Sequence, residues 1–209
     1  MSVLTSVAVG LGLAAACGFR LFVPFLVLGI AARLGEVPLT SGFAWLASNE
    51  ALLALTVATV LEAAAYKVPW LDHLLDLLAS PAAVFAGMLA SAAVVTDLPP
   101  LLRWGAIVIG GGGAAALVQG TTVLARVKSA VTTGGLGNPL VALWELGSAF
   151  VTSVLAILAP FLALLLLGIV VGGILILFFS RSKGVRTRSI TSSSMSGISR
   201  RAGASTTRP

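Results

Sequence analysis

Three charged residues lie within otherwise apolar runs of this 209-residue sequence: Arg20, Glu62 and Glu145. A charge in membrane hydrocarbon costs about 2.5–3.5 kcal/mol on insertion scales, so each one needs a partner or a water-filled cavity. Arg20 follows Gly18 and precedes Pro24, where we expect the helix to break, and irregular backbone at that depth needs the same protection. The chemistry expected of these residues is the binding and passage of a small ion or polar solute.

Further hydrogen-bonding residues lie near these charges in the sequence. Tyr66 and Lys67 follow Glu62 by about one helical turn, and Asn138 opens the apolar run that contains the second acid. The acids favour a cation or a proton, because two carboxylates in one cavity can exchange a proton, whereas Arg20 favours an anion. The sequence leaves that choice open. The cavity candidates are Arg20, Glu62, Tyr66, Lys67, Asp72, Asn138 and Glu145.

Two other hypotheses remain open for the same acids. Each carboxylate could hold helices together by pairing with Arg20, Lys67 or Arg126, which would make the protein a non-transporting membrane scaffold. An intramembrane enzyme acting on lipid would instead need Glu62 and Glu145 as an acid–base pair. Transport is the function we expect, and no enzyme activity is expected.

The most polar stretch between apolar runs covers residues 126–139. Its two positive charges, hydroxyl groups and glycine amides could hold an anion just before a helix begins. The alternative is a flexible cytoplasmic loop. No lysine follows its glycines in the spacing of a nucleotide-binding loop. The four glycines at 110–113 are expected to let helices approach closely. The anion-loop candidates are Arg126, Lys128, Thr132 and Thr133.

Single copies of two reactive residue types exclude several kinds of site. One cysteine, Cys17, excludes an intrachain disulfide, and one histidine, His73, excludes a multi-histidine metal site and a hydrolytic triad elsewhere in the chain. His73 shares one helical face with Asp72 and Asp76, which is typical of a short amphipathic helix that lies at the membrane interface or packs against the bundle. A weak metal or proton site is the alternative there. We expect no catalytic residues, no metal ion and no cofactor.

The elements that must position these residues are membrane helices. The chain is 58% hydrophobic and 10% charged, with a mean hydropathy of +1.08, whereas soluble domains carry about 25% charged residues. We therefore expect an all-α integral membrane protein with a polytopic helical domain at 1–179. Residues 180–209, rich in Ser and Arg, are expected to form a disordered cytoplasmic tail.

Six apolar runs are candidates for membrane crossings, since a crossing needs about 20 residues. The first is expected to be one broken helix, and two halves of three crossings could form an inverted repeat. The fifth and sixth runs meet at residues 159–160, either as a tight hairpin or as one long kinked helix preceded by a re-entrant segment. The runs are 3–32, 51–66, 81–95, 101–124, 139–158 and 161–179.

Basic residues set the expected orientation. The tail holds seven of the thirteen basic residues and no acid, which is typical of a cytoplasmic segment that can bind anionic lipid or a partner protein rather than nucleic acid. With six crossings, Lys67, Arg126 and Lys128 are also cytoplasmic, and Arg33 and Arg103 are outside. We expect the inner membrane as the location, with both termini cytoplasmic. The oligomeric state is not predicted.

Several short motifs occur together along residues 5–178. They are GFR at 18–20 with Pro24, EAAAYKVPWLD at 62–72, TTGG at 132–135, NP at 138–139 and Glu145. In combination they resemble the bacterial membrane proteins grouped as domain of unknown function 4126. The resemblance implies a small polytopic membrane protein without an established activity. The usual pattern has an aspartate where this chain has Tyr66, so no role of that aspartate in binding a cation or a proton is implied here.

Overall fold

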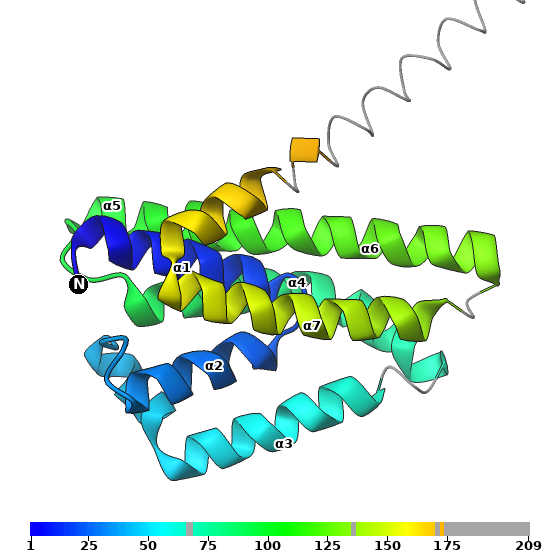
Figure 1. Ribbon diagram of the computed structural model, residues 1–209, viewed down its shortest axis with the longest axis horizontal. Coiled ribbons are helices and arrows are strands. Elements are labelled where there is room, and N and C mark those ends of the chain that lie inside the picture. The colour runs from blue at the N-terminus through cyan, green and yellow to red at the C-terminus, as the bar shows by residue number, and fades with distance from the viewer. Residues whose placement is uncertain (66–68, 135–136, 170–171, 174–209) are drawn as a thin grey trace, which may run out of the picture. The chain divides into compact units, whose positions relative to one another are not determined.

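A computed structural model describes residues 1–65, 69–134, 137–169 and 172–173, with 69–77 described by their backbone alone. Every element among these residues is helical, as the composition predicts, and Met1–Gly168 form one compact unit (Figure 1). The elements are α1 (Val3–Cys17), α2 (Phe22–Arg33), η1 (Ser41–Ala47), α3 (Asn49–Ala65), α4 (Pro69–Val94), α5 (Pro100–Gly105), η2 (Ala106–Gly112), α6 (Gly113–Thr133) and α7 (Asn138–Leu158).

The break predicted in the first apolar run is present, but the chain reverses direction there. α1 ends at Cys17 and α2 begins at Phe22. Gly10 of α1 and Thr40, which follows α2, both contact residues 91–95 at the end of α4. The run is therefore an antiparallel helical hairpin (Figure 1) and not the single broken crossing expected from the sequence.

Packing between the two arms accounts for this reversal. Leu13 of α1 and Leu28 of α2 are both fully buried in the same hydrophobic cluster. A straight continuation of α1 would carry Leu28 away from Leu13 and remove it from this cluster. We call residues 18–21, which connect the arms, the hairpin tip.

The central helices differ from the sequence prediction in length. α4 runs without interruption from Pro69 to Val94 with Pro81 inside it, so the segment 70–78 is the first part of this helix and not a separate interfacial one. A proline inside a helix removes one backbone hydrogen bond and leaves the flanking ones, which carry the helix on. The interfacial placement of Asp72, His73 and Asp76 involves side chains outside the described residues.

One continuous helical run, Pro100–Thr133, covers the fourth apolar run and continues beyond it. Its central part, η2, has π-helical geometry over the glycine-rich segment. Residues 126–133 are helical, so the expectation of a polar loop beginning at Arg126 is wrong. The helix ends at Gly134, whose φ of 62° is left-handed. Glycine tolerates that conformation at little cost, which makes it a common helix terminator.

The fifth apolar run forms α7 as predicted, and the chain leaves the helical conformation at Ala159 (φ −143°, ψ 68°). A new helix follows over Pro160–Ile169. Ala163 of this helix is buried and lies near Gly12 of α1. The structure therefore has two separate helices here and not one long kinked helix.

Small residues lie at several of the closest approaches between helices. A Cβ atom added to Gly12 would lie 2.6 Å from the Cβ of Ala156, and one added to Gly87 would lie 2.5 Å from the Cβ of Ala115. A Cβ on Gly111 would meet the Ser91 hydroxyl at 2.3 Å. Close approach through small residues is typical of helix packing in membranes. It confirms the role predicted for the glycine-rich segment.

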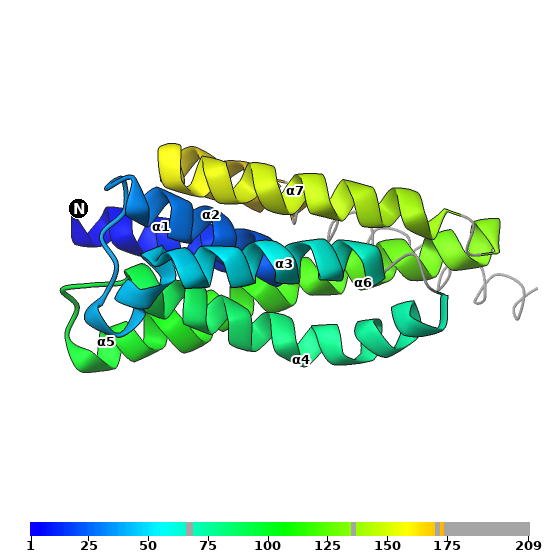
Figure 2. The same cartoon turned by 90° about the horizontal axis from the view of Figure 1, so that it is seen from below.

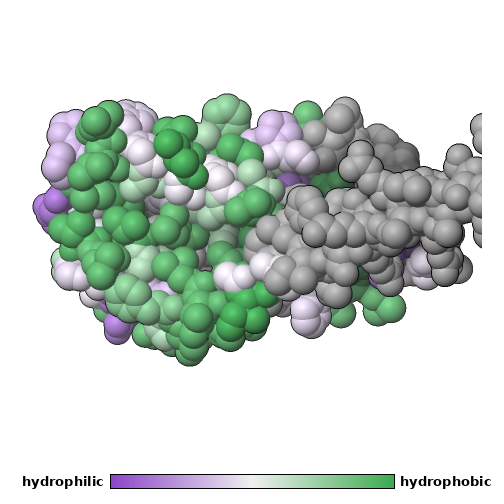
Figure 3. Space-filling model, turned by 90° about the horizontal axis from the view of Figure 1, so that it is seen from above, coloured by the Kyte–Doolittle hydropathy of each residue, from purple (hydrophilic) through white to green (hydrophobic). Residues whose placement is uncertain are grey.

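Large apolar side chains cover much of the exterior. Figure 3 shows one mostly apolar face, and exposed leucines, valines and aromatic residues occur on every long helix. Among the residues that the structure describes, two helices are long and apolar enough to cross a membrane, the run Pro100–Thr133 and α7, and η1 with α3 gives a third candidate bent by 71°. These features are compatible with a membrane protein. Six crossings and an inverted repeat are not confirmed.

α3 lies at the edge of the bundle (Figure 1, Figure 2), where it packs on α2 and η1. Of its residues only Ala51, near its beginning, is fully buried. Its outer side chains, including Leu53, Val57 and Leu61, are exposed. This helix is therefore held by fewer apolar contacts than α1, whose second half is buried.

Candidate functional site

The hairpin tip is held close to α6. A Cβ on Gly18 would lie 2.6 Å from the carbonyl oxygen of Ala115 and 2.9 Å from the backbone nitrogen of Gln119. Only a residue without a side chain allows this approach. The contact fixes the position of the following residues, among them Arg20, deep in the bundle, where its side chain is 2% exposed.

Glu62 of α3 binds the backbone of the hairpin at the start of α2. The N–H of Leu21 donates to Oε1 at 3.0 Å, and the N–H of Phe22 donates to Oε2 at 3.3 Å. These amides have no acceptor within their own helix, because the first N–H groups of a helix lack intrahelical partners. The carboxylate satisfies them and also matches the positive end of the helix dipole.

Arg20 reaches from the hairpin tip to α7. Its Nη2 donates to the carbonyl oxygen of Ala142 at 2.8 Å and lies 3.6 Å from Oε2 of Glu145. Through these noncovalent contacts the guanidinium holds the hairpin tip against α7, which lies more than one hundred residues away in sequence. Its positive charge meets a carboxylate in a setting from which water is largely excluded.

Arg126 of α6 binds the same carboxylate in a bidentate manner. Its Nε donates to Oε1 of Glu145 at 2.8 Å, and its Nη2 donates to Oε2. Such paired hydrogen bonds match the planar fork of arginine to both carboxylate oxygens. Arg126 is 6% exposed and Glu145 2%. We call Arg20, Glu145 and Arg126 the buried ion cluster.

Helical periodicity explains why the cluster forms inside the bundle. On α7, Glu145 precedes Ala149, Ser153 and Ala156 at helical spacing, and all four are buried. On α6, Arg126 belongs to a buried face that begins at Ala115. Both charged residues thus occupy inward faces made mostly of small residues, which leave space for long side chains.

The sequence-predicted residues divide into three groups. The structure brings together Arg20, Glu62 and Glu145 around the hairpin tip. Asn138 lies apart, at the start of α7, and its buried Oδ1 has no hydrogen-bond partner among the described residues. Tyr66, Lys67 and the side chain of Asp72 lie outside the described residues.

The four anion-loop candidates do not form one site. Arg126 is part of the buried ion cluster, whereas Lys128, Thr132 and Thr133 are exposed near the end of α6. The hydroxyl of Thr132 donates to the carbonyl oxygen of Lys128 at 2.8 Å, and Oγ1 of Thr133 accepts the N–H of Gly137 at 2.9 Å. These hydroxyls form hydrogen bonds with backbone groups at the end of α6. In the part of the chain that the structure describes, no cluster of His, Cys, Asp and Glu could hold a metal ion.

Arg126 is predicted from the sequence in two ways, and the structure separates them. Its pairing with an acid, one of three alternatives, is confirmed by its bonds to Glu145, whereas its position in a polar loop is wrong, because it lies in α6. The signal that favours burial is its spacing from Ala115, Val118 and Thr122, which puts all four on one face of a helix. The polar segment that follows it concealed that periodicity.

The comparison with protein families covers most of the chain. A family model described as Domain of unknown function (DUF4126) matches residues 7–180. The chain belongs to this family. The match to DUF4126 includes the hairpin, α3 and the whole buried ion cluster, and it ends where the basic tail begins. No curated protein and no solved structure matches the chain.

Proposed function

We propose that this DUF4126 protein is an integral membrane protein that passes a small ion or polar solute through its helical bundle. The observation that carries the proposal is the hairpin tip, where irregular backbone and three charged side chains meet inside an apolar protein. Irregular backbone at membrane depth is tolerated where protein or a water-filled cavity satisfies it. Interrupted helices whose free backbone groups bind solutes are a recurrent feature of transporters.

Glu62 is the group at the hairpin tip that a solute would displace from the backbone N–H groups. Its carboxylate, carried by α3, accepts hydrogen bonds from the N–H groups at the start of α2. The Glu62 side chain is partly exposed. α3, which carries it, packs only on α2 and η1 among the larger interhelical contacts of the described residues. A small outward movement of α3 would remove the carboxylate and open the amides of Leu21 and Phe22 to a solute or to water.

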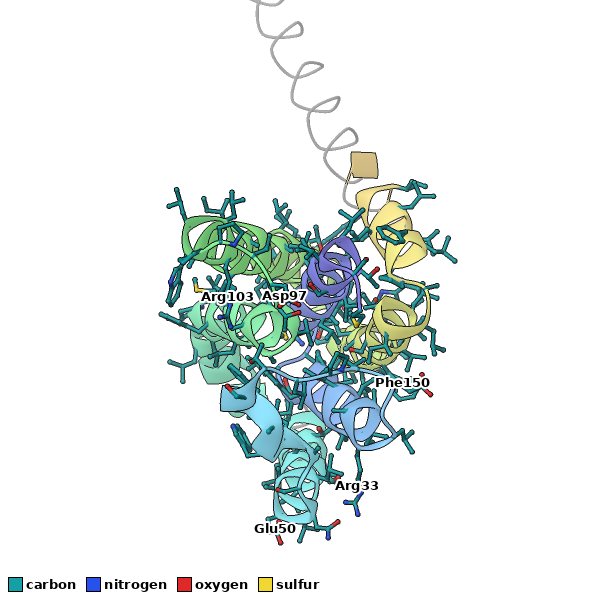
Figure 4. All side chains as sticks on the ribbon, turned by 90° about the vertical axis from the view of Figure 1, so that its left-hand side faces the viewer. Arg33, Glu50, Asp97, Arg103 and Phe150 are labelled. Atoms are coloured by element: carbon teal, nitrogen blue, oxygen red, sulfur yellow. The ribbon has the colours of Figure 1, made fainter. Side chains whose placement is uncertain are left out.

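The orientation proposed for the membrane follows from the basic residues. Arg33 and Arg103 lie at the same end of the bundle (Figure 4), whereas residues 181–209 carry seven basic residues and no acid. The positive-inside rule therefore favours a cytoplasmic basic tail, available to anionic lipid, and an outer position for Arg33 and Arg103.

The scaffold hypothesis is the second candidate, and one observation favours it. Both oxygens of Glu145 are engaged by Arg126, and Arg20 lies beside them. A carboxylate held in this way stabilises three segments and offers no vacant position to a solute. We therefore assign the structural role to the buried ion cluster and the solute-binding role to Glu62, in a carrier or channel and not in an enzyme.

Flux into proteoliposomes tests this assignment. Full-length protein is reconstituted, and the movement of protons, alkali cations and small anions is followed with entrapped dyes for the wild type, Glu62→Gln and Glu50→Gln. Glu50 is the matched control, because it is an exposed acid in the first turn of the same helix, far along α3 from Glu62. We expect flux in the wild type and in Glu50→Gln, and its loss in Glu62→Gln with the fold retained. Absence of flux for every ion, with both variants folded, would establish the scaffold hypothesis instead.

A further inference from the structure

An apolar groove lies between α2 and α7, away from the hairpin tip. Its volume is about 280 Å³ and its walls include Val27 and Ile30 of α2 and Val154 and Ile157 of α7. This volume is near the lower end of the range of about 300–1,000 Å³ for ligand pockets. The groove is thus suited to one narrow apolar chain and not to a bulky ring system.

One acidic side chain stands at the end of this groove. Glu36 is the only charged residue among its lining side chains, and it is exposed. Within the described part of the chain, its carboxylate forms no ion pair or side-chain hydrogen bond. Arg33, the nearest basic residue in sequence, donates to Oδ1 of Asn49 and projects away from the helices (Figure 4). The mouth of the groove therefore carries an uncompensated negative charge.

The end of α2 holds Glu36 in this position. Gly35 is left-handed, with φ of 81°; its N–H donates to the carbonyl oxygen of Ala32 at 3.1 Å, and the N–H of Glu36 donates to that of Ala31 at 3.0 Å. This pair of bonds is a Schellman motif, which fixes the residue after the glycine relative to the helix. Ala31 itself lines the groove, so the motif ties the acid to the groove wall.

We propose that the groove between α2 and α7 binds one acyl chain of a membrane phospholipid whose head group carries an ammonium ion, with Glu36 contacting that ammonium. The proposal rests only on the membrane-embedded part of the proposed function. The apolar walls match an acyl chain, and the unpaired carboxylate attracts the ammonium of a zwitterionic head group and repels a head group with a net negative charge. Phosphatidylethanolamine has this chemistry, and phosphatidylglycerol is its anionic counterpart.

Photolabelling of the full-length protein tests the proposal. Vesicles of phosphatidylcholine contain the protein and a trace of either phosphatidylethanolamine or phosphatidylglycerol with a photoactivatable diazirine in one acyl chain. Mass spectrometry then measures the label on the α2 and α7 peptides that line the groove. We expect about two- to fivefold more label from the ethanolamine lipid, the ratio that an exposed ion pair provides, and equal labelling by both lipids on the outer face of α3 around Val57.

Single substitutions distinguish the contribution of Glu36 from that of the apolar groove walls. Glu36→Gln should make both lipids label the groove equally, whereas Glu50→Gln, another exposed acid (Figure 4), should leave the preference intact. Val154→Phe should fill the groove and abolish its labelling by both lipids. Equal labelling in the wild type, a preference that survives Glu36→Gln, or groove labelling that survives Val154→Phe would each overturn the proposal. Solute flux plays no part in this readout, so failure of the transport hypothesis would not affect it.

Discussion

Two carboxylates meet the hairpin region of this protein, and their settings differ. Glu145 is 2% exposed and is bound by the guanidinium group of Arg126, with that of Arg20 beside it. Glu62 is partly exposed and binds two backbone N–H groups at a helix start. The first carboxylate neutralises fixed charges that cannot leave the protein. The second satisfies groups that water or a solute could satisfy equally well, which is why we assign the two acids different roles.

Glu145→Gln should have the largest effect on stability. Removing this charge leaves two arginines buried without their carboxylate, and breaking a buried ion pair costs about 3–5 kcal/mol. Unfolding in detergent micelles, followed by circular dichroism, measures the change in the free energy of unfolding, with Glu50→Gln as the exposed control. A loss for Glu145→Gln no larger than for the control would mean that the cluster does not stabilise the bundle.

Gly18→Ala should have the next largest effect, because it displaces the hairpin tip that both carboxylates contact. The added methyl group would meet the Ala115 carbonyl and Val118, and such overpacking costs about 1–3 kcal/mol. Gly113→Ala is the matched control: its Cβ would meet no other atom within 4 Å, and alanine favours the helix by about 0.8–1 kcal/mol. The same unfolding assay should therefore give opposite signs, and a neutral Gly18→Ala would contradict the close contact between the tip and α6.

Glu62→Gln should destabilise the protein less than Glu145→Gln. The amide keeps one acceptor oxygen for the two N–H groups and loses the charge at the start of α2, a change comparable to losing a helix cap, about 0.5–2 kcal/mol. Hydrogen exchange of α2 and α3, measured by mass spectrometry, should increase while the remaining helices stay protected. Equal exchange increases throughout the bundle would instead assign Glu62 to the stabilising cluster.

Lys128→Ala and Thr132→Ala should have the smallest effects. Both side chains are exposed near the end of α6, and surface substitutions of this kind usually change the free energy of unfolding by less than about 0.5 kcal/mol. Sulfate, titrated by calorimetry, should bind neither variant nor the wild type, because the segment is a helix end without a closed anion site. Saturable sulfate binding lost in either variant would restore the anion-loop hypothesis.

The sequence predicts the helical class, the break after Cys17 and the burial of Arg20 and Glu145, because each follows from composition or from local residue types. It does not predict the chain reversal after Cys17, which depends on the burial of Leu13 and Leu28 in one cluster and on the close approach of Gly18 to Ala115, far along the chain. The local polarity of residues 126–139 predicts a loop at Arg126, whereas its bonds to Glu145 of α7 hold it on the buried face of α6. The close-packed role of Gly111, in contrast, was evident from the run of glycines.

The hairpin also has a consequence for the order of events during synthesis. α1 and α2 are synthesised before α4, α6 and α7, yet the residues that bury α1, including Gly87, Ala115 and Ala156, belong to these later helices. Neither arm is long enough to insert alone as a crossing. We therefore expect the hairpin to remain uninserted, at the membrane surface or bound to a chaperone, until α4, α6 and α7 have been synthesised. Nascent chains truncated before α7 should leave Cys17 open to a thiol reagent, and chains that include α7 should protect it.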